Sequence, residues 1–211
     1  MTRDAVRPAG TPPVFAKRLL AAVLLLVPLT ACTQPEIPPD RYYRIVVGKP
    51  ESPLARPPLD GTLEVDRPDA DGLLGARPIV YAEAARPNEL QEYSYDFWSE
   101  PPALMLQSEL VSYLRAAHVA DLVVTPGLRV NAAYQLSGRL RRLEQLVGDP
   151  TQVLIEIEVA VRDNRLGRIV LLKTYRAEAS PADATLPAAV DAFGKAFSAI
   201  AARLTADLAS R

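Results

Sequence analysis

Residues 153–161 carry the most regular pattern in this chain, with an apolar side chain at every second position. The apolar positions are Val153, Ile155, Ile157, Val159 and Val161. Glu156 and Glu158 lie between them. Strict alternation indicates a strand with one face buried and the other in water, as in antiparallel sheets. A sheet of this kind needs a second apolar layer on its buried face, which limits the chain to layered folds.

Other segments are also predicted to be strands, because they alternate or are rich in β-branched and aromatic residues. These segments are residues 42–47, 62–66, 78–81, 89–97, 122–124, 134–141 and 168–176. Two stretches rich in proline, 33–41 and 50–58, are expected to be an extended tether and a loop.

Two segments have the three-four apolar spacing of amphipathic helices. The first begins at the sequence Ser-Glu-Pro-Pro of residues 99–102, where Ser99 is expected to cap the helix, and its apolar face runs to Ala117. The second covers residues 185–210, with a stripe from Val190 to Leu208 that has Phe197 near its middle. The sequence therefore predicts an α+β fold: a twisted, mainly antiparallel sheet with two helices packed on one face.

The N-terminal region has the layout of a secretory signal peptide. Two basic residues, at 17–18, precede the apolar run 19–27, and Leu29-Thr30-Ala31-Cys32 follows. A cysteine directly after small residues resembles a bacterial lipobox. In that motif the chain is cut between Ala31 and Cys32, and Cys32 receives diacylglycerol on sulfur and an acyl group such as palmitate on its new amino group. The alternative, a membrane span, is disfavoured because the run is about half of the ~20 residues required.

The predicted organisation has three parts. Residues 1–31 are a lipoprotein signal peptide, 32–41 are the lipidated cysteine with its proline-rich tether, and 42–211 are one periplasmic domain. Cys32 is the only cysteine, so no disulfide is expected and the apolar core must hold the fold. With 24 Lys and Arg against 25 Asp and Glu, the chain is not expected to bind nucleic acid, which requires clustered cations.

The inventory of reactive groups does not indicate an enzyme. The single histidine, His118, falls at the end of the first predicted helix, where an imidazolium would interact favourably with the helix dipole. No zinc-protease, phosphate-loop, dinucleotide or serine-hydrolase motif is found in the sequence.

Two acidic groups were considered as sites and are interpreted as structural. The series Asp66, Asp69 and Asp71 lacks the glycine and distal glutamate of a calcium loop, so it is interpreted as a solvated turn. Glu156 and Glu158 are expected to form cross-strand ion pairs, with Arg139 and Arg141 as the partners. No catalytic residue, metal or cofactor is therefore predicted, apart from the covalent lipid on Cys32.

Several segments together resemble one known family. They are 77–81, 88–90 and the run 97–102 around Trp98, the sequence Tyr-Tyr-Arg-Ile of 42–45 just after a lipobox, and the closing amphipathic helix. In this combination the chain resembles the ABC-type transport auxiliary lipoproteins, the PqiC/YmbA-like family, over nearly all of residues 32–211. Tyr43 and Trp98 match landmarks of that family.

The resemblance implies a non-enzymatic lipoprotein on the periplasmic face of the outer membrane. Its partners would be an ABC transporter and MCE-domain proteins, which form a route for lipids between the two membranes, and the protein would dock this assembly at the outer membrane. Thr33 after Cys32 fits outer-membrane sorting, because aspartate there is the usual inner-membrane retention signal.

The sequence leaves some alternatives open. Tyr43, Tyr95 and Trp98 are candidates for a partner surface, since aromatic residues are enriched in hot spots, but Tyr95 and Trp98 also fit a core or its rim. Tyr42 and Tyr43 point to opposite faces of a strand, so at most one of them is expected to be exposed. A lipoprotein activator of a peptidoglycan synthase is the alternative function, an outer-membrane hydrolase is a weaker one, and a homo-oligomer stays open.

Overall fold

The sheet is built around its longest strand, β6 (Tyr134–Val147). The computed structural model describes residues 37–211, so the predictions for the signal peptide, Ala31 and Cys32 lie outside the described residues. One edge of β6 pairs antiparallel with β7 (Gln152–Asp163), which in turn pairs antiparallel with β8 (Arg168–Ala179). The other edge is shared by two parallel strands, β2 (Leu59–Val65) and β3 (Pro78–Glu83).

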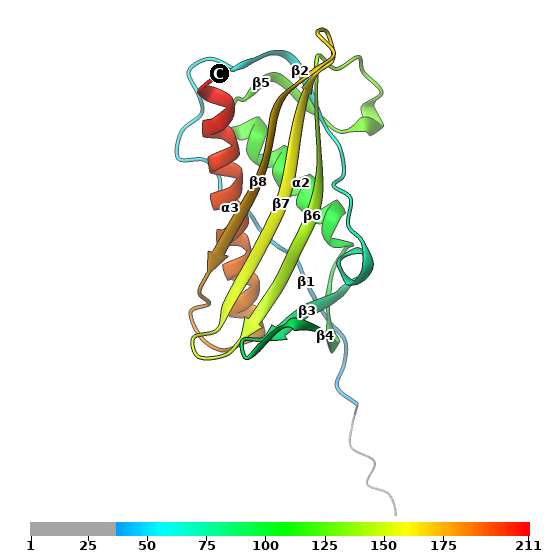
Figure 1. The fold of residues 1–211 in the computed structure, drawn as a ribbon, viewed down its shortest axis with the longest axis vertical. Coiled ribbons are helices and arrows are strands. Elements are labelled where there is room, and N and C mark those ends of the chain that lie inside the picture. The colour runs from blue at the N-terminus through cyan, green and yellow to red at the C-terminus, as the bar shows by residue number, and fades with distance from the viewer. Residues whose placement is uncertain (1–36) are drawn as a thin grey trace, which may run out of the picture. The chain divides into compact units, whose positions relative to one another are not determined.

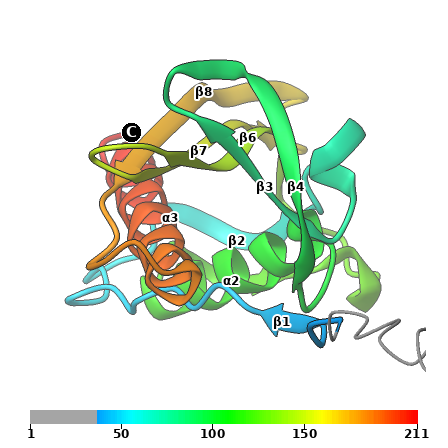
Figure 2. The same ribbon diagram turned by 90° about the horizontal axis from the view of Figure 1, so that it is seen from below.

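Three further strands complete the described sheet. β5 (Ala120–Val124) pairs parallel with β2, β4 (Arg86–Trp98) pairs antiparallel with β3, and β1 (Arg41–Tyr43) pairs parallel with β4. The α+β class is confirmed. Antiparallel pairing supplies the longest ladders, while the parallel pairs are shorter, so the sheet is mixed and curls on itself (Figure 2).

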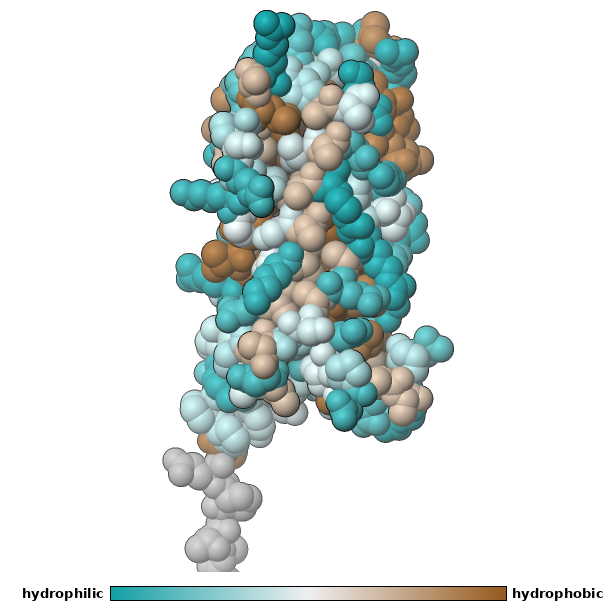
Figure 3. Space-filling view, turned by 90° about the vertical axis from the view of Figure 1, so that its left-hand side faces the viewer, coloured by the Kyte–Doolittle hydropathy of each residue, from teal (hydrophilic) through white to brown (hydrophobic). Residues whose placement is uncertain are grey.

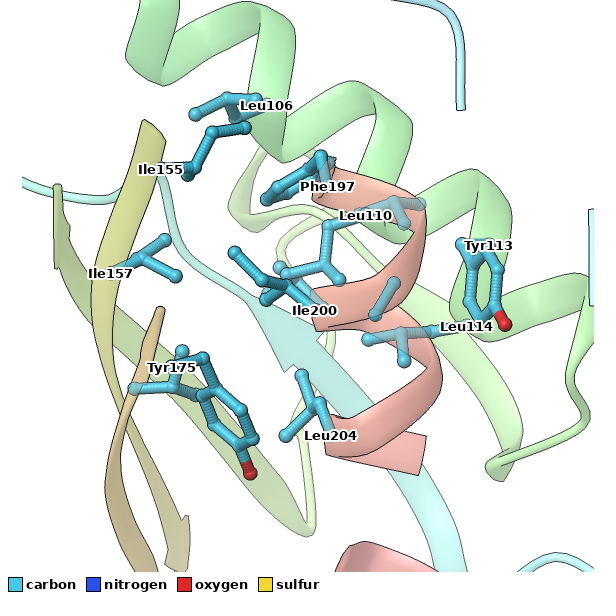
Figure 4. Close-up of a cluster of buried hydrophobic side chains, with 14 of the residues drawn as sticks. Leu106, Leu110, Tyr113, Leu114, Ile155, Ile157, Tyr175, Phe197, Ile200 and Leu204 are labelled. Atoms are coloured by element: carbon cyan, nitrogen blue, oxygen red, sulfur yellow. The ribbon is translucent and has the colours of Figure 1, made fainter. Parts of the chain in front are cut away.

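Both long helices lie on the same side of the curled sheet, as the sequence predicts (Figures 1 and 2). They are α2 (Pro102–Ala116) and α3 (Leu186–Ala209). Two short 3-10 turns, η2 (Gly72–Gly75) and η3 (Pro126–Leu128), lie in loops. The apolar stripe of α3 faces β7 and β8, and Phe197, Ile200 and Leu204 meet residues of α2 and β7 there (Figure 4).

The two helices begin differently. Thr185 caps α3, because its Oγ1 accepts a hydrogen bond from the Ala188 amide at 3.3 Å. The expectation that Ser99 caps α2 is wrong: Pro101 holds the cap position and no side chain bonds the free amides. The backbone of Ser99 is used elsewhere, since its amide donates to the Tyr43 carbonyl at 2.7 Å. Ser99 thus extends the pairing between β1 and β4.

The first strand is shorter than the sequence suggests. β1 ends at Tyr43, and residues 44–58, which we call the strap, have no helix or strand. The strap crosses the side of the helices that faces away from β6–β8 (Figure 2). Its amides bond side chains of the helices: Ile45 N to Met105 Sδ at 3.2 Å, Val47 N to Glu109 Oε2 at 2.9 Å and Gly48 N to Ser198 Oγ at 2.9 Å. Side chains of the helices therefore accept the hydrogen bonds that the strap amides would otherwise donate to a neighbouring strand.

Candidate functional site

The residues considered for catalysis or metal binding lie on different elements in the described part of the chain. Among residues 37–211, no group of three or more His, Cys, Asp and Glu side chains is placed to hold a metal ion. His118 follows the end of α2 in a left-handed conformation with φ 58°, and its Nδ1 lies 3.0 Å from the Leu54 carbonyl oxygen. His118 thus joins the strap to the end of α2.

The acidic series lies along the edge of β6 and is not the turn that the sequence predicts, because Asp69 forms an isolated parallel bridge with Arg139. Asp69 and Asp71 are exposed, and the backbone of Asp69 bonds to β6 at Gly138 and Leu140. Asp66 accepts a hydrogen bond from Gln135 Nε2 at 2.8 Å. Partial burial raises the pKa of Asp66, although this hydrogen bond acts in the opposite direction.

The cross-strand ion pairs are confirmed in part. Arg141 contacts Glu158 at 2.6 Å. Glu156 lies opposite Arg142 in the β6–β7 register, and Arg142 pairs instead with the buried Glu144. The Arg141–Glu158 pair lies on the sheet surface, and exposed pairs of this kind contribute little stability.

The three aromatic candidates for a partner surface occupy different environments. Trp98 is 1% exposed and packs edge-on against Phe193, with ring centroids 5.5 Å apart, so the structure places it in the core. Tyr43 is half-buried at the rim of the core, and burial, followed by the hydrogen bond and charge of Asp96, raises its pKa. Tyr95 is 36% exposed on β4 and stays available to a partner.

The structure brings Tyr42 together with two residues that the sequence did not single out, at the end where β1 lies beside β4. Tyr42 is 56% exposed and its ring lies 5.8 Å from that of Phe97, its partner in the register. The guanidinium of Arg77 stands 5.1 Å from the centre of the Tyr42 ring. We call Tyr42, Arg77 and Phe97 the aromatic end. The prediction that at most one of the tyrosine pair is exposed is confirmed, and that residue is Tyr42.

An ion pair between the exposed Arg41 and the buried Asp96 fixes β1 beside this aromatic end. Arg41 Nε lies 2.7 Å from Asp96 Oδ1, and its Nη2 donates to Asp96 Oδ2 at 2.8 Å. Asp96 is buried, and a buried carboxylate needs such a partner. The two residues are 55 positions apart, so no local pattern indicates their pairing.

A second surface lies along β8, which pairs only with β7 among the described strands. Figure 3, which views the molecule from the left of Figure 1, shows hydrophilic side chains beside a pale apolar band and an apolar area near the upper right edge. Leu166, Ile169 and Leu172 are exposed at this end of the β7–β8 hairpin. Further along β8, Arg203 of α3 donates a hydrogen bond to the Arg176 carbonyl oxygen at 2.5 Å. This bond occupies a carbonyl group on the strand edge and so disfavours pairing with another strand there.

Comparison with known proteins identifies the family. A sequence model of the ABC-type transport auxiliary lipoprotein component matches residues 43–205. The chain belongs to this family. The resemblance drawn from residues 42–45 and 97–102 is therefore confirmed. Membership in a lipoprotein family indicates a membrane-anchored protein that faces the periplasm. No helix in residues 37–211 is long and apolar enough to cross a membrane.

Solved structures show that the fold of this auxiliary lipoprotein is shared. A crystal structure of a protein from Xanthomonas campestris is 21% identical, with a TM-score of 0.68, covering 78% of this chain and 92% of that one. A second crystal structure, of an uncharacterized protein, is 14% identical with a TM-score of 0.63, covering 81% and 99%. No curated protein matches the chain.

Proposed function

We propose that this auxiliary lipoprotein is a non-enzymatic subunit of an ABC/MCE-type intermembrane lipid transport system, and that it docks the periplasmic assembly at the outer membrane. The observation that carries the proposal is the family match over residues 43–205. The Leu29-Thr30-Ala31-Cys32 sequence supplies the means of attachment, since acylation of Cys32 would hold the domain at a membrane.

The geometry of the domain supports an adaptor. Catalysis requires convergent reactive groups in one pocket, whereas His118 and the Asp66–Asp71 segment make structural contacts on different elements. The domain instead offers a rigid core and two exposed surfaces, the aromatic end and the edge of β8. Thr33 after Cys32 supports sorting to the outer membrane.

Co-purification from native membranes tests this function. The full-length protein, tagged after Arg211, is solubilised in mild detergent and its partners are identified by mass spectrometry. We expect MCE-domain and ABC transporter components to be recovered, in amounts that fall when Cys32→Ala replaces the wild type. Recovery of a peptidoglycan synthase instead would support the alternative function and contradict the transport role. The mass of the purified complex shows whether several copies assemble.

A further inference from the structure

The aromatic end lies where the described domain begins, which is the side closest along the chain to Cys32. Tyr42 follows Cys32 by ten residues. Even fully extended, ten residues span at most about 36 Å. The covalent chain therefore keeps Tyr42 within about 36 Å of the residue that the lipobox assigns to the membrane.

The Arg41–Asp96 ion pair holds the start of β1 against β4. Arg41 immediately precedes Tyr42, and its guanidinium is held by a carboxylate of β4 through contacts of 2.7 and 2.8 Å. The parallel register then sets Tyr42 opposite Phe97. The chain therefore enters the domain next to the aromatic end.

The chemistry of the aromatic end is that of a membrane–water interface. Tyr42 is 56% exposed and yet held in place, with Phe97 against one side of its ring and Arg77 nearby. Tyrosine is enriched at bilayer interfaces because its ring is apolar and its hydroxyl is polar. Arginine can bury its aliphatic stem and keep its charge among the headgroups.

From these observations we infer that the aromatic end rests on the bilayer that holds the lipid of Cys32, with Tyr42 and Phe97 among the lipid headgroups. This inference rests on the acylation included in the proposed function. Charges of both signs surround the site: Arg77 and Arg44 are exposed, and the Tyr42 hydroxyl donates to Asp40 Oδ2 at 3.2 Å. The contact is therefore driven by the aromatic rings and depends little on salt or on anionic lipid.

Depth-dependent fluorescence quenching tests the contact. Trp98 is the only tryptophan of the chain and is buried, so it provides a constant background. Full-length acylated protein carrying Tyr42→Trp is reconstituted into vesicles of phosphatidylethanolamine and phosphatidylglycerol with brominated acyl chains. The matched control is Leu128→Trp, which is 60% exposed on η3, away from β1 (Figure 1).

We expect the bromolipid to quench Tyr42→Trp at least about twofold more than Leu128→Trp after subtraction of the Trp98 signal, since a residue at the interface lies roughly 5–10 Å into the boundary. Raising the salt concentration should leave this difference unchanged. Equal quenching of the two reporters would overturn the inference.

The outcome separates this inference from the proposed function. If co-purification recovers no transport partner but Tyr42→Trp is quenched, the function fails and the membrane contact stands. If transport partners are recovered but the two reporters are quenched equally, the contact alone fails. Cys32→Ala should abolish vesicle association of both reporters, and a Cys32 that is not acylated in the wild type would overturn both.

Discussion

The two sides of the helix layer are held by different kinds of interaction. Toward β7 and β8, α2 and α3 bury a continuous apolar cluster that contains Phe197, Ile200 and Tyr175 (Figure 4). On the other side the strap is fastened by single hydrogen bonds from its amides to Met105 and Glu109. Only some of the strap's apolar side chains are buried: Ile45 is buried, whereas Val46 is 68% exposed.

The difference teaches how stability is distributed in the domain. Apolar burial grows with area and is shared by many residues, so the sheet side forms one cooperative unit. The strap depends on a few polar bonds that each contribute about 1 kcal/mol. We therefore expect variants on the sheet side to shift global unfolding, and variants of the strap to act mainly on local opening.

The largest effect is expected at Phe197, in the middle of the apolar stripe. Phe197 is 1% exposed, so Phe197→Ala should cost on the order of 3–5 kcal/mol. Urea unfolding of residues 33–211, with and without the substitution, measures the change. An unchanged midpoint together with lost partner binding would mean that the stripe is an interface and that the core assignment is wrong.

A smaller effect is expected where the strap touches α3. A Cβ atom on Gly194 would stand 2.4 Å from the Val46 carbonyl oxygen, so Gly194→Ala should push the strap away and cost about 1–3 kcal/mol. Alanine normally favours a helix over glycine by about 1 kcal/mol, so Ala199→Gly, at an exposed position of α3, is the matched control.

Both substitutions should therefore lower the urea midpoint, although they are opposite changes. Only Gly194→Ala should also speed hydrogen exchange at the Val47 and Gly48 amides. A Gly194→Ala variant that is more stable than the wild type would show that the strap does not need this close approach.

The hydrogen bond to Glu109 offers a sharper test of the strap. Glu109 Oε2 accepts from the Val47 amide at 2.9 Å, so Glu109→Ala should cost about 1 kcal/mol and speed exchange of that amide. Glu109→Gln keeps an acceptor oxygen and should retain most of the protection. Equal exchange in the two variants would show that the strap is held by its apolar residues alone.

The hydrogen bonds that Asp207 accepts on the sheet side should make a pH-dependent contribution to stability. Asp207 of α3 accepts hydrogen bonds from Lys173 Nζ at 2.8 Å and from the Tyr175 hydroxyl at 2.7 Å, and these bonds hold its pKa below the ordinary value. A depressed folded-state pKa gives stability that is present above the unfolded pKa, about 3.9, and is lost as pH falls through the folded value.

Asp207→Asn should therefore lower the urea midpoint at neutral pH, and the difference from the wild type should shrink as the pH falls below about 4. Asp191→Asn, exposed on the same helix, controls for the loss of one carboxylate. A difference that stays constant with pH would exclude the carboxylate as its source.

The smallest effect is expected at His118. The bond between Nδ1 and the Leu54 carbonyl is exposed, so His118→Ala should cost roughly 0.5 kcal/mol and leave cellular function near that of the wild type. Complementation of a deletion strain measures function. Complete loss of function with normal folding and abundance would revive a catalytic or metal role.

The elements themselves could be predicted because their signals are local. Period-two alternation marked β7 and the start of β6, and the three-four stripe from Val190 to Leu208 marked α3. Each pattern reports which face of a segment is buried, whatever the distant partner is. The expected α+β class followed from their order, and the family followed from short motifs around residues 42–45 and 97–102.

The candidate surfaces depended on contacts between distant segments. Nothing in the sequence around Asp96 indicates that it pairs with Arg41. Which ring of the tyrosine pair is exposed depends on the pairing of β1 with β4. Trp98 likewise lies in the core, where Phe193 of α3 packs against it.

The sequence alone determined the elements, the family and the attachment motif at Cys32, since these depend on neighbouring residues along the chain. Only the tertiary structure decided the parallel pairing of β1, the path of the strap and the aromatic end. The physical reason is that a backbone amide donates to any well-placed acceptor, whether on a strand edge or on a side chain such as Glu109. Packing in three dimensions decides which acceptor it meets.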